Sequence, residues 1–235
     1  MAVVRKAKDT NARMGSKMSE LRPHPAVYSD ALLPVMAEML QGCHYVLDPF
    51  AGTGKIFQLK KWLPETCFEA VEIEPEWAAY DPRITLGNAL YLPWPNDAFD
   101  GVCVSPTYSN RMADHHRAVD GSKRVSYKHY LGHDLSPSNT GAMQWGAKYQ
   151  WAHQVAWLEA KRVLVRGGKF VLNIKDHVRK GKVMPVTEWH IHTLRDLGFE
   201  LLDHVTVDCP GMGFGQNRDA RVPFESVILF ELRGK

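Results

Sequence analysis

An acidic residue and two glycines follow a strongly apolar run in the segment VLDPFAGTGK, at residues 46–55. Glycine tolerates positive φ and lets a ligand approach the main chain, and the amides at the start of a following helical segment attract negative groups. The G-x-x-x-x-G-K-[ST] spacing of a phosphate loop is absent, and Asp48 would repel a phosphate. The turn with Gly52 and Gly54 therefore predicts a site for a cationic or hydroxyl-bearing ligand, with a ligand-free tight turn as the alternative.

Two more acids end the next apolar run, in the segment VEIEP at residues 71–75. They come about twenty residues after the glycine turn, where dinucleotide-binding folds place an acid that accepts both ribose hydroxyls. Glu72 or Glu74 fits that role. Asn88, after the following apolar run, could bind an adenine edge through its amide, although asparagine is also common in turns.

These residues need a scaffold that brings the ends of separate strands together. Apolar runs of strand length alternate with helical patterns, and the first five are separated by stretches too long for tight hairpins, which favours parallel crossovers. The last two runs have no helical pattern between them, so we expect an α/β fold whose parallel sheet ends in an antiparallel pair. The expected strands are residues 45–50, 67–74, 83–86, 100–106, 169–174, 199–207 and 222–232.

Helical periodicity marks three segments, which are residues 29–40, 151–164 and 187–198. Ser29 or Asp30 is placed to cap the first, and Thr187 is placed to cap the third, which Gly198 would end. Gly167 and Gly168 would close the second.

Residues 107–150 break this alternation, because they contain few periodic apolar residues. A connection this long in a compact domain is usually functional or disordered. Its aromatic content argues against ordinary disorder. We therefore expect a substrate-binding insertion within one domain over residues 23–235, preceded by a basic and flexible leader over residues 1–22. The aromatic residues are Tyr108, Tyr127, Tyr130, Trp145 and Tyr149.

The net charge of +3 is unevenly distributed. Residues 1–23 hold six Lys or Arg and two acids, and residues 109–150 hold six and three, so the remainder of the chain is acidic. Basic segments on an acidic body suit a polyanionic partner such as nucleic acid, although a basic leader can also be a solvated tail. No run of about 18 apolar residues occurs, and no secretory signal pattern begins the chain, so we expect a cytoplasmic protein with reduced cysteines.

Three motifs together resemble one family. DPFAGTG, VEIEPEWA and FDGVCVSPTY are similar to segments of the S-adenosylmethionine-dependent DNA amino-methyltransferases, which methylate cytosine N4 or adenine N6. The resemblance implies a Rossmann-like class I methyltransferase fold and S-adenosyl-L-methionine as cofactor. It also implies that a tetrapeptide of the form [DNS]-P-P-[YFW] is catalytic. Here that tetrapeptide reads Ser105, Pro106, Thr107 and Tyr108, so a threonine replaces the second proline.

The resemblance carries two sets of site residues to this chain. The catalytic set is Ser105, Pro106 and Tyr108. The cofactor set is His24, Pro25, Asp48, Pro49, Phe50, Gly52, Gly54, Glu72 and Asn88. In the mechanism that we expect, the Ser105 hydroxyl and the Pro106 carbonyl accept hydrogen bonds from the target amine, and Tyr108 stacks on the base.

DNA is the expected partner, with cytosine N4 slightly favoured over adenine N6, and RNA is the alternative. A second alternative is a nucleic-acid-binding module that keeps the cofactor fold without turnover. The insertion would hang over the pocket and contact phosphates through Arg111, Arg117, Lys123, Arg124 and Lys128. The basic segment at residues 173–182 suits either a phosphate-contacting loop or a solvated one. We expect no metal site, because His115–His116 and His190-x-His192 lack a third ligand at a recognisable spacing.

Overall fold

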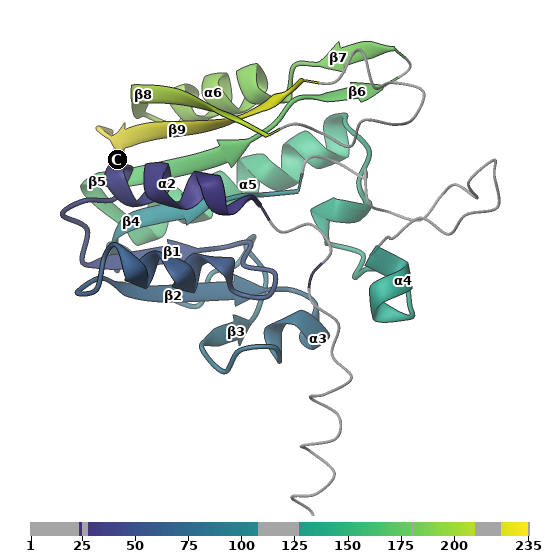
Figure 1. Ribbon diagram of the computed structural model, residues 1–235, viewed down its shortest axis with the longest axis horizontal. Helices are drawn as coiled ribbons and strands as arrows, with labels where there is room; N and C mark the ends of the chain where they lie inside the picture. The colour runs from purple at the N-terminus through teal and green to yellow at the C-terminus, as the bar shows by residue number, and fades with distance from the viewer. Residues whose placement is uncertain (1–23, 25–27, 108–126, 180, 210–221, 235) are drawn as a thin grey trace, which may run out of the picture.

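The computed structural model describes residue 24 and residues 28–107, 127–179, 181–209 and 222–234. A seven-stranded sheet in the order β3-β2-β1-β4-β5-β9-β8 forms the centre of the molecule (Figure 1). Its strands are β1 (Tyr45–Asp48), β2 (Cys67–Glu72), β3 (Ile84–Leu86), β4 (Phe99–Val104), β5 (Leu164–Ile174), β8 (Phe199–Asp208) and β9 (Phe224–Leu232). The first five strands pair in parallel, and β9 pairs antiparallel with both β5 and β8. The expected parallel sheet with an antiparallel end is confirmed.

Helices cover both faces of the sheet (Figure 1). On one face α5 (Ala147–Val163) and α6 (Val186–Asp196) pack with the sheet in a core that includes Trp157 and Phe170. On the other face α2 (Leu33–Met39) and the 3₁₀ helix η2 (Lys55–Lys61) form a second core with strand residues such as Val46 and Val171. A short 3₁₀ turn, η1 (Asp30–Leu32), leads into α2, and the Ser29 hydroxyl caps it by accepting from the Ala31 amide.

The smaller elements lie in the crossovers. α3 (Pro75–Ala78) follows β2, and α4 (Tyr127–Leu131) and the 3₁₀ turn η4 (Thr140–Ala142) lie in the expected insertion. β6 (His177–Arg179) and β7 (Lys182–Met184) form a separate two-stranded antiparallel sheet. The sequence predicts a loop over residues 173–182, but the structure has this strand pair there. Each strand is only three residues long, which is too short for alternation of apolar and polar residues to predict it.

Two helix boundaries differ from those that we expected. Gly167 and Gly168 do not close α5, which ends at Val163; they lie within β5, where Gly167 has φ +79°. The register against β4 shifts at this point, so the glycines allow a bulge in the strand. Thr187 lies in the first turn of α6 and does not cap it; its amide donates to Asp176 Oδ1 at 2.7 Å.

All four cysteines are free, as expected. Among the residues that the structure describes, no helix is long and apolar enough to cross a membrane.

Candidate cofactor and amine site

Parallel strands present their carboxyl ends at one edge of a sheet, and open α/β sheets bind ligands there. β1 lies between β2 and β4, so the sheet brings the ends of these three strands side by side. Asp48 ends β1, Glu72 ends β2, and Ser105 follows β4 directly. The glycine turn, Glu72 and the first residues of the tetrapeptide therefore lie at the same edge of the sheet.

The glycine turn after β1 is held by the acids beside it. The Gly52 amide donates to Glu72 Oε2 at 2.9 Å, and the Phe50 amide donates to Asp48 Oδ1 at 2.9 Å. Gly52 has φ +54° and Gly54 has φ +84°, which are conformations that other residues adopt only with strain. A Cβ on Gly54 would also lie 2.8 Å from the Phe57 ring, so this position requires glycine.

Both acids are almost completely buried, with exposed fractions of 3% for Asp48 and 7% for Glu72. Burial raises the pKa of each carboxyl to about 7, against the opposing effect of the backbone amides that they accept from. Neither acid forms an ion pair among the described residues. The glycine turn is thus flanked by two carboxyl groups whose ionised forms a cationic ligand would favour.

Glu74 has a different role from Glu72. It is fully buried and accepts hydrogen bonds from the Ser136 amide at 2.8 Å, the Ser136 hydroxyl at 3.0 Å and Asn139 Nδ2 at 2.7 Å. These contacts fasten residues 136–139 of the insertion to the end of β2. Of the two acids that the sequence offers for a ribose, the structure leaves Glu72 at the glycine turn and commits Glu74 to the insertion.

The other expected cofactor residues differ in their surroundings. The His24 ring lies 3.3 Å from the position of a Cβ on Gly52 and packs edge-on against Trp77, with the ring centroids 4.1 Å apart. Pro49 is buried, and the Phe50 ring stacks on that of His153 at 5.6 Å. Pro25 lies outside the described residues. The Oδ1 atom of Asn88 accepts from the Leu90 amide at 3.0 Å, so at least this atom serves a turn.

Ser105 and Thr107 of the tetrapeptide form hydrogen bonds with residues of β5, η4 and α5. Ser105 Oγ accepts from Asn173 Nδ2 at 3.1 Å, and this amide nitrogen also donates to Glu225 Oε2 at 3.0 Å. Pro106 is buried. Thr107 Oγ1 lies 2.6 Å from Thr140 Oγ1, and the Thr107 carbonyl accepts from the Tyr149 hydroxyl at 2.8 Å. Tyr108 lies outside the described residues.

Sequence reasoning did not assign Asn173, Thr140 or Tyr149 to the site. Asn173 lies within the expected strand at residues 169–174, and its position near the carboxyl end of that strand was the available signal. Lys128 lies in α4, and its side chain is not described. The other expected phosphate contacts, which are Arg111, Arg117, Lys123 and Arg124, lie outside the described residues. Within the described part of the chain, no group of three His, Cys, Asp or Glu side chains is placed to bind a metal ion.

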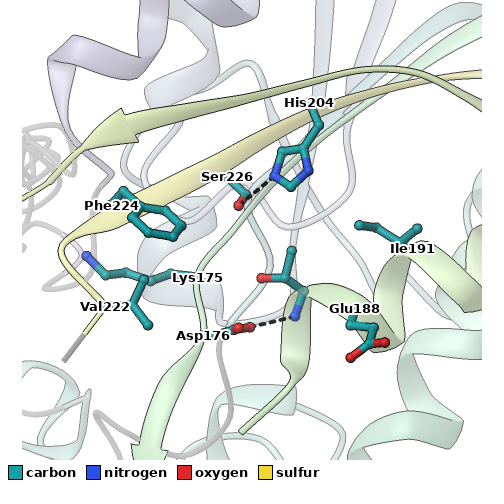
Figure 2. Close-up of a pocket in the computed structure, with 9 residues that line it drawn as sticks. Lys175, Asp176, Glu188, Ile191, His204, Val222, Phe224 and Ser226 are labelled. Carbon is teal, nitrogen blue, oxygen red and sulfur yellow. Dashed lines mark hydrogen bonds between the residues drawn. The ribbon is translucent and has the colours of Figure 1, made fainter. Parts of the chain in front are cut away.

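A cleft of about 310 Å³ lies between α6 and the antiparallel strands (Figure 2). His204 Nε2 and Ser226 Oγ, from the paired strands β8 and β9, lie 2.9 Å apart on one side of it, and Phe224 and Ile191 give it apolar walls. The cleft reaches the carboxyl edge of the parallel strands at Lys175 and Asp176, which follow β5. The cleft contains no residue of the glycine turn or the tetrapeptide, so it is separate from the site described above.

Comparison with known proteins relates the chain to others through its fold alone. No family model matches the sequence, and no curated protein matches it. An S-adenosylmethionine-dependent methyltransferase from Methanosarcina mazei superposes with a TM-score of 0.56 at 13% identity, over 89% of this chain and 99% of that one. The fold is that of the class I methyltransferases.

Two further structures with this class I methyltransferase fold show the range of proteins that share it. A 1,6-didemethyltoxoflavin-N1-methyltransferase from Burkholderia thailandensis, solved with S-adenosylhomocysteine, superposes with a TM-score of 0.53 at 16% identity, over 99% of this chain and 94% of that one. The [4+2]-cyclase SpnF superposes with a TM-score of 0.53 at 15% identity, over 88% and 81%. Because proteins with one fold catalyse different reactions, the function of this chain depends on the residues of its own site.

Proposed function

We propose that this protein transfers a methyl group from S-adenosyl-L-methionine to an exocyclic amine of a base in DNA, with cytosine N4 slightly favoured over adenine N6. The observation that carries the proposal is that the glycine turn, with its buried acids, and the first three residues of the tetrapeptide follow the adjacent parallel strands β1 and β4 at the same edge of the sheet. One group of residues suits the cofactor and the other suits an amine.

The residues at the glycine turn fit S-adenosylmethionine chemically. This cofactor is cationic at its sulfonium and ammonium groups and carries a ribose. Two buried carboxyl groups without an ion-pair partner among the described residues suit the cationic groups and the ribose hydroxyls. Glu72 would hold the ribose, Asp48 ends β1 just before the turn, and Gly52 and Gly54 would let the ligand approach the main chain. When bound, the cofactor supplies an electrophilic methyl group.

The tetrapeptide would handle the amine. An exocyclic amine is a weak nucleophile because its lone pair is delocalised into the ring. If Ser105 Oγ and the Pro106 carbonyl accept hydrogen bonds from its two N–H groups, the lone pair of the nitrogen is directed out of the ring plane. One of the two protons is released to solvent once the methyl group is bound to the nitrogen. Holding two reactants in such geometry supplies much of the rate enhancement in reactions of this kind. Asn173 fixes the Ser105 hydroxyl, and a flipped base would stack on Tyr108.

The decisive experiment is incubation with labelled S-adenosylmethionine and separate pools of DNA, RNA and small-molecule amines, followed by mass spectrometry of the nucleosides. N4-methylcytosine or N6-methyladenine from the DNA pool is the expected product. Modification of RNA alone would replace DNA as the substrate. Cofactor binding without methyl transfer to any pool would favour the non-catalytic binding module.

A further inference from the structure

Thr107 occupies the third position of the tetrapeptide, where the similar family has a second proline. A proline ring would fix φ at this residue, whereas threonine leaves it free to rotate. The structure holds Thr107 by other means, because its side chain and its carbonyl are bonded to two different segments of the chain. The hydroxyl meets Thr140 Oγ1 of η4 at 2.6 Å, and the carbonyl meets Tyr149 Oη of α5 at 2.8 Å.

The contact from Tyr149 has a fixed direction. Trp157 Nε1 can only donate, and it donates to His190 Nδ1 at 3.1 Å. The imidazole proton of neutral His190 therefore resides on Nε2, which donates to Tyr149 Oη at 3.2 Å. The Tyr149 hydroxyl hydrogen is then left for the Thr107 carbonyl.

This row of groups is buried and keeps its proton arrangement. Trp157, His190 and Tyr149 all have exposed fractions of 0%. Burial lowers the pKa of His190 well below its usual value and raises that of Tyr149, so both stay neutral around physiological pH. A neutral and fully bonded row cannot change its hydrogen-bond direction without leaving a buried polar atom unpaired, which costs about 1–3 kcal/mol.

The contact at Thr140 links the tetrapeptide to the cofactor side. Thr140 follows Asn139, whose Nδ2 donates to Glu74, the residue just before α3. The Glu74 amide in turn donates to Glu72, which holds the Gly52 amide. The position of Thr107 is thus set by α5 on one side and by the cofactor turn on the other.

We propose that Tyr149 and Thr140 are positioning residues that clamp Thr107 and thereby orient the Pro106 carbonyl towards the target amine, in place of the ring of a second proline. This inference rests on the proposed function of the tetrapeptide. The clamp acts through Thr107 and touches neither substrate nor cofactor.

Two isosteric variants test the clamp. Tyr149→Phe removes the donor to the Thr107 carbonyl, and Thr140→Val removes the hydroxyl that meets Thr107 Oγ1. The matched control is Thr66→Val, which also removes a buried threonine hydroxyl. Thr66 lies just before β2, at the amino ends of the parallel strands, and its hydroxyl donates to the Cys43 carbonyl at 2.8 Å. Thr140→Ser keeps the hydroxyl and is the conservative rescue.

The first readout is hydrogen exchange of the peptide that contains residues 105–107, which needs no substrate. Both clamp variants should raise exchange in this peptide, and Thr66→Val and Thr140→Ser should not. The second readout is methyl transfer, in which both clamp variants should lower kcat by at least about tenfold with little change in KM or in cofactor affinity, because positioning of the reacting groups is impaired and binding is not.

The two readouts separate the clamp from the proposed function. Unchanged exchange in both variants would overturn the clamp. If the clamp variants show raised exchange but keep the same kcat as the Thr66→Val control, the contact is purely structural, and the positioning role would be overturned. A wild-type protein that methylates no pool would refute the proposed function, and with it the catalytic role of the clamp, while the exchange data would still decide whether the clamp exists.

Discussion

Two groups of buried polar side chains at the carboxyl side of the sheet differ in how they are stabilised. Within the described part of the chain, Asp48 and Glu72 accept hydrogen bonds only from main-chain amides, and burial raises their pKa values to about 7. Tyr149 and His190, on α5 and α6, are bonded to other side chains and to the Thr107 carbonyl, and both are neutral. The first group carries a charge that a ligand would stabilise, whereas the second is complete without one.

This difference separates two tasks within one site. A group that is destabilised in the free protein gains from ligand binding, which suits the recognition of a charged cofactor. A group that is fully bonded in the free protein keeps its geometry before the substrate arrives, which suits the positioning of an amine. Variants in the acid group should therefore change cofactor affinity, and variants around the tetrapeptide should change turnover.

The largest expected effect is at the glycine turn. Gly52→Val places a branched side chain at φ +54° against the His24 ring, and Glu72→Ala removes the acceptor of the Gly52 amide. We expect each to weaken S-adenosylmethionine binding by at least about a hundredfold, since the first distorts the turn and the second removes the ribose acceptor. Titration calorimetry measures this.

Gly42→Val is the control for the turn. Gly42 has φ +83°, so it suffers similar backbone strain, but open space surrounds the position of its Cβ. Its variant should bind the cofactor normally. If Gly52→Val and Glu72→Ala both bind as the wild type does, the cofactor lies elsewhere.

The next largest effect should come from Tyr108→Ala, on the other side of the comparison. Loss of base stacking, which is worth about 1–3 kcal/mol, should lower methyl transfer by about 10- to 100-fold. The affinity for S-adenosylmethionine should not change, because the acid group is intact. Turnover assays with saturating cofactor test this, and a wild-type rate would place the amine pocket away from the tetrapeptide.

The contrast between the two groups also marks what the sequence could predict. Each strand run with its terminal residue is a local pattern, so Asp48, Glu72 and Ser105 could be placed at one edge from strand order alone. The hydrogen bonds of Thr107 with Thr140 and Tyr149 join positions 33 and 42 residues apart, across a stretch with few periodic apolar residues. Such bonds depend on tertiary packing, which the spacing of residue types does not encode.

The same reason explains the errors at the boundaries. Gly167 and Gly168 fit a helix end and a strand bulge equally well, and only the pairing with β4 decides between them. The choice between Glu72 and Glu74 likewise depended on the distant Ser136 and Asn139. For the tetrapeptide, the sequence showed only that Thr107 replaces a proline, whereas the structure supplies two hydrogen bonds there.

The third prediction concerns nucleic-acid binding, and it should affect neither the acids at the glycine turn nor the residues around the tetrapeptide. Charge reversal at Lys123 and Arg124, which lie outside the described residues, should weaken nucleic-acid binding by about tenfold. It should also flatten the salt dependence of binding by about one unit of slope for each phosphate that is no longer neutralised. Cofactor affinity should be unaltered. An unchanged salt slope in fluorescence anisotropy titrations would move the binding surface to residues 175–182 or 209–221.

The smallest effect tests the difference between the two groups directly, through pH. Because the pKa of Asp48 is raised when the chain folds, the folded state binds the proton more tightly than the unfolded state does. The stability that protonated Asp48 contributes to the fold is fully present below about pH 4 and is lost as pH rises through about 7. His153, whose pKa burial lowers to about 4, acts in the opposite sense and destabilises the fold as pH falls below about 6.5.

Asp48→Asn isolates the acid from this opposing effect, since asparagine keeps an oxygen for the Phe50 amide and cannot ionise. Relative to the wild type, the cofactor-free variant should gain stability as pH rises from about 5 to about 8, by on the order of 1–2 kcal/mol or a few degrees in Tm. Asp203→Asn, at an exposed carboxyl that accepts the His204 amide, should show no such gain. Calorimetry across this range measures the difference.

The same Asp48→Asn variant should bind S-adenosylmethionine more weakly, because the charge that destabilises the free protein is the one that the cofactor needs. A variant that becomes more stable at high pH without losing affinity would show that Asp48 is buried for the fold alone, and the distinction between the two groups would then rest on Glu72.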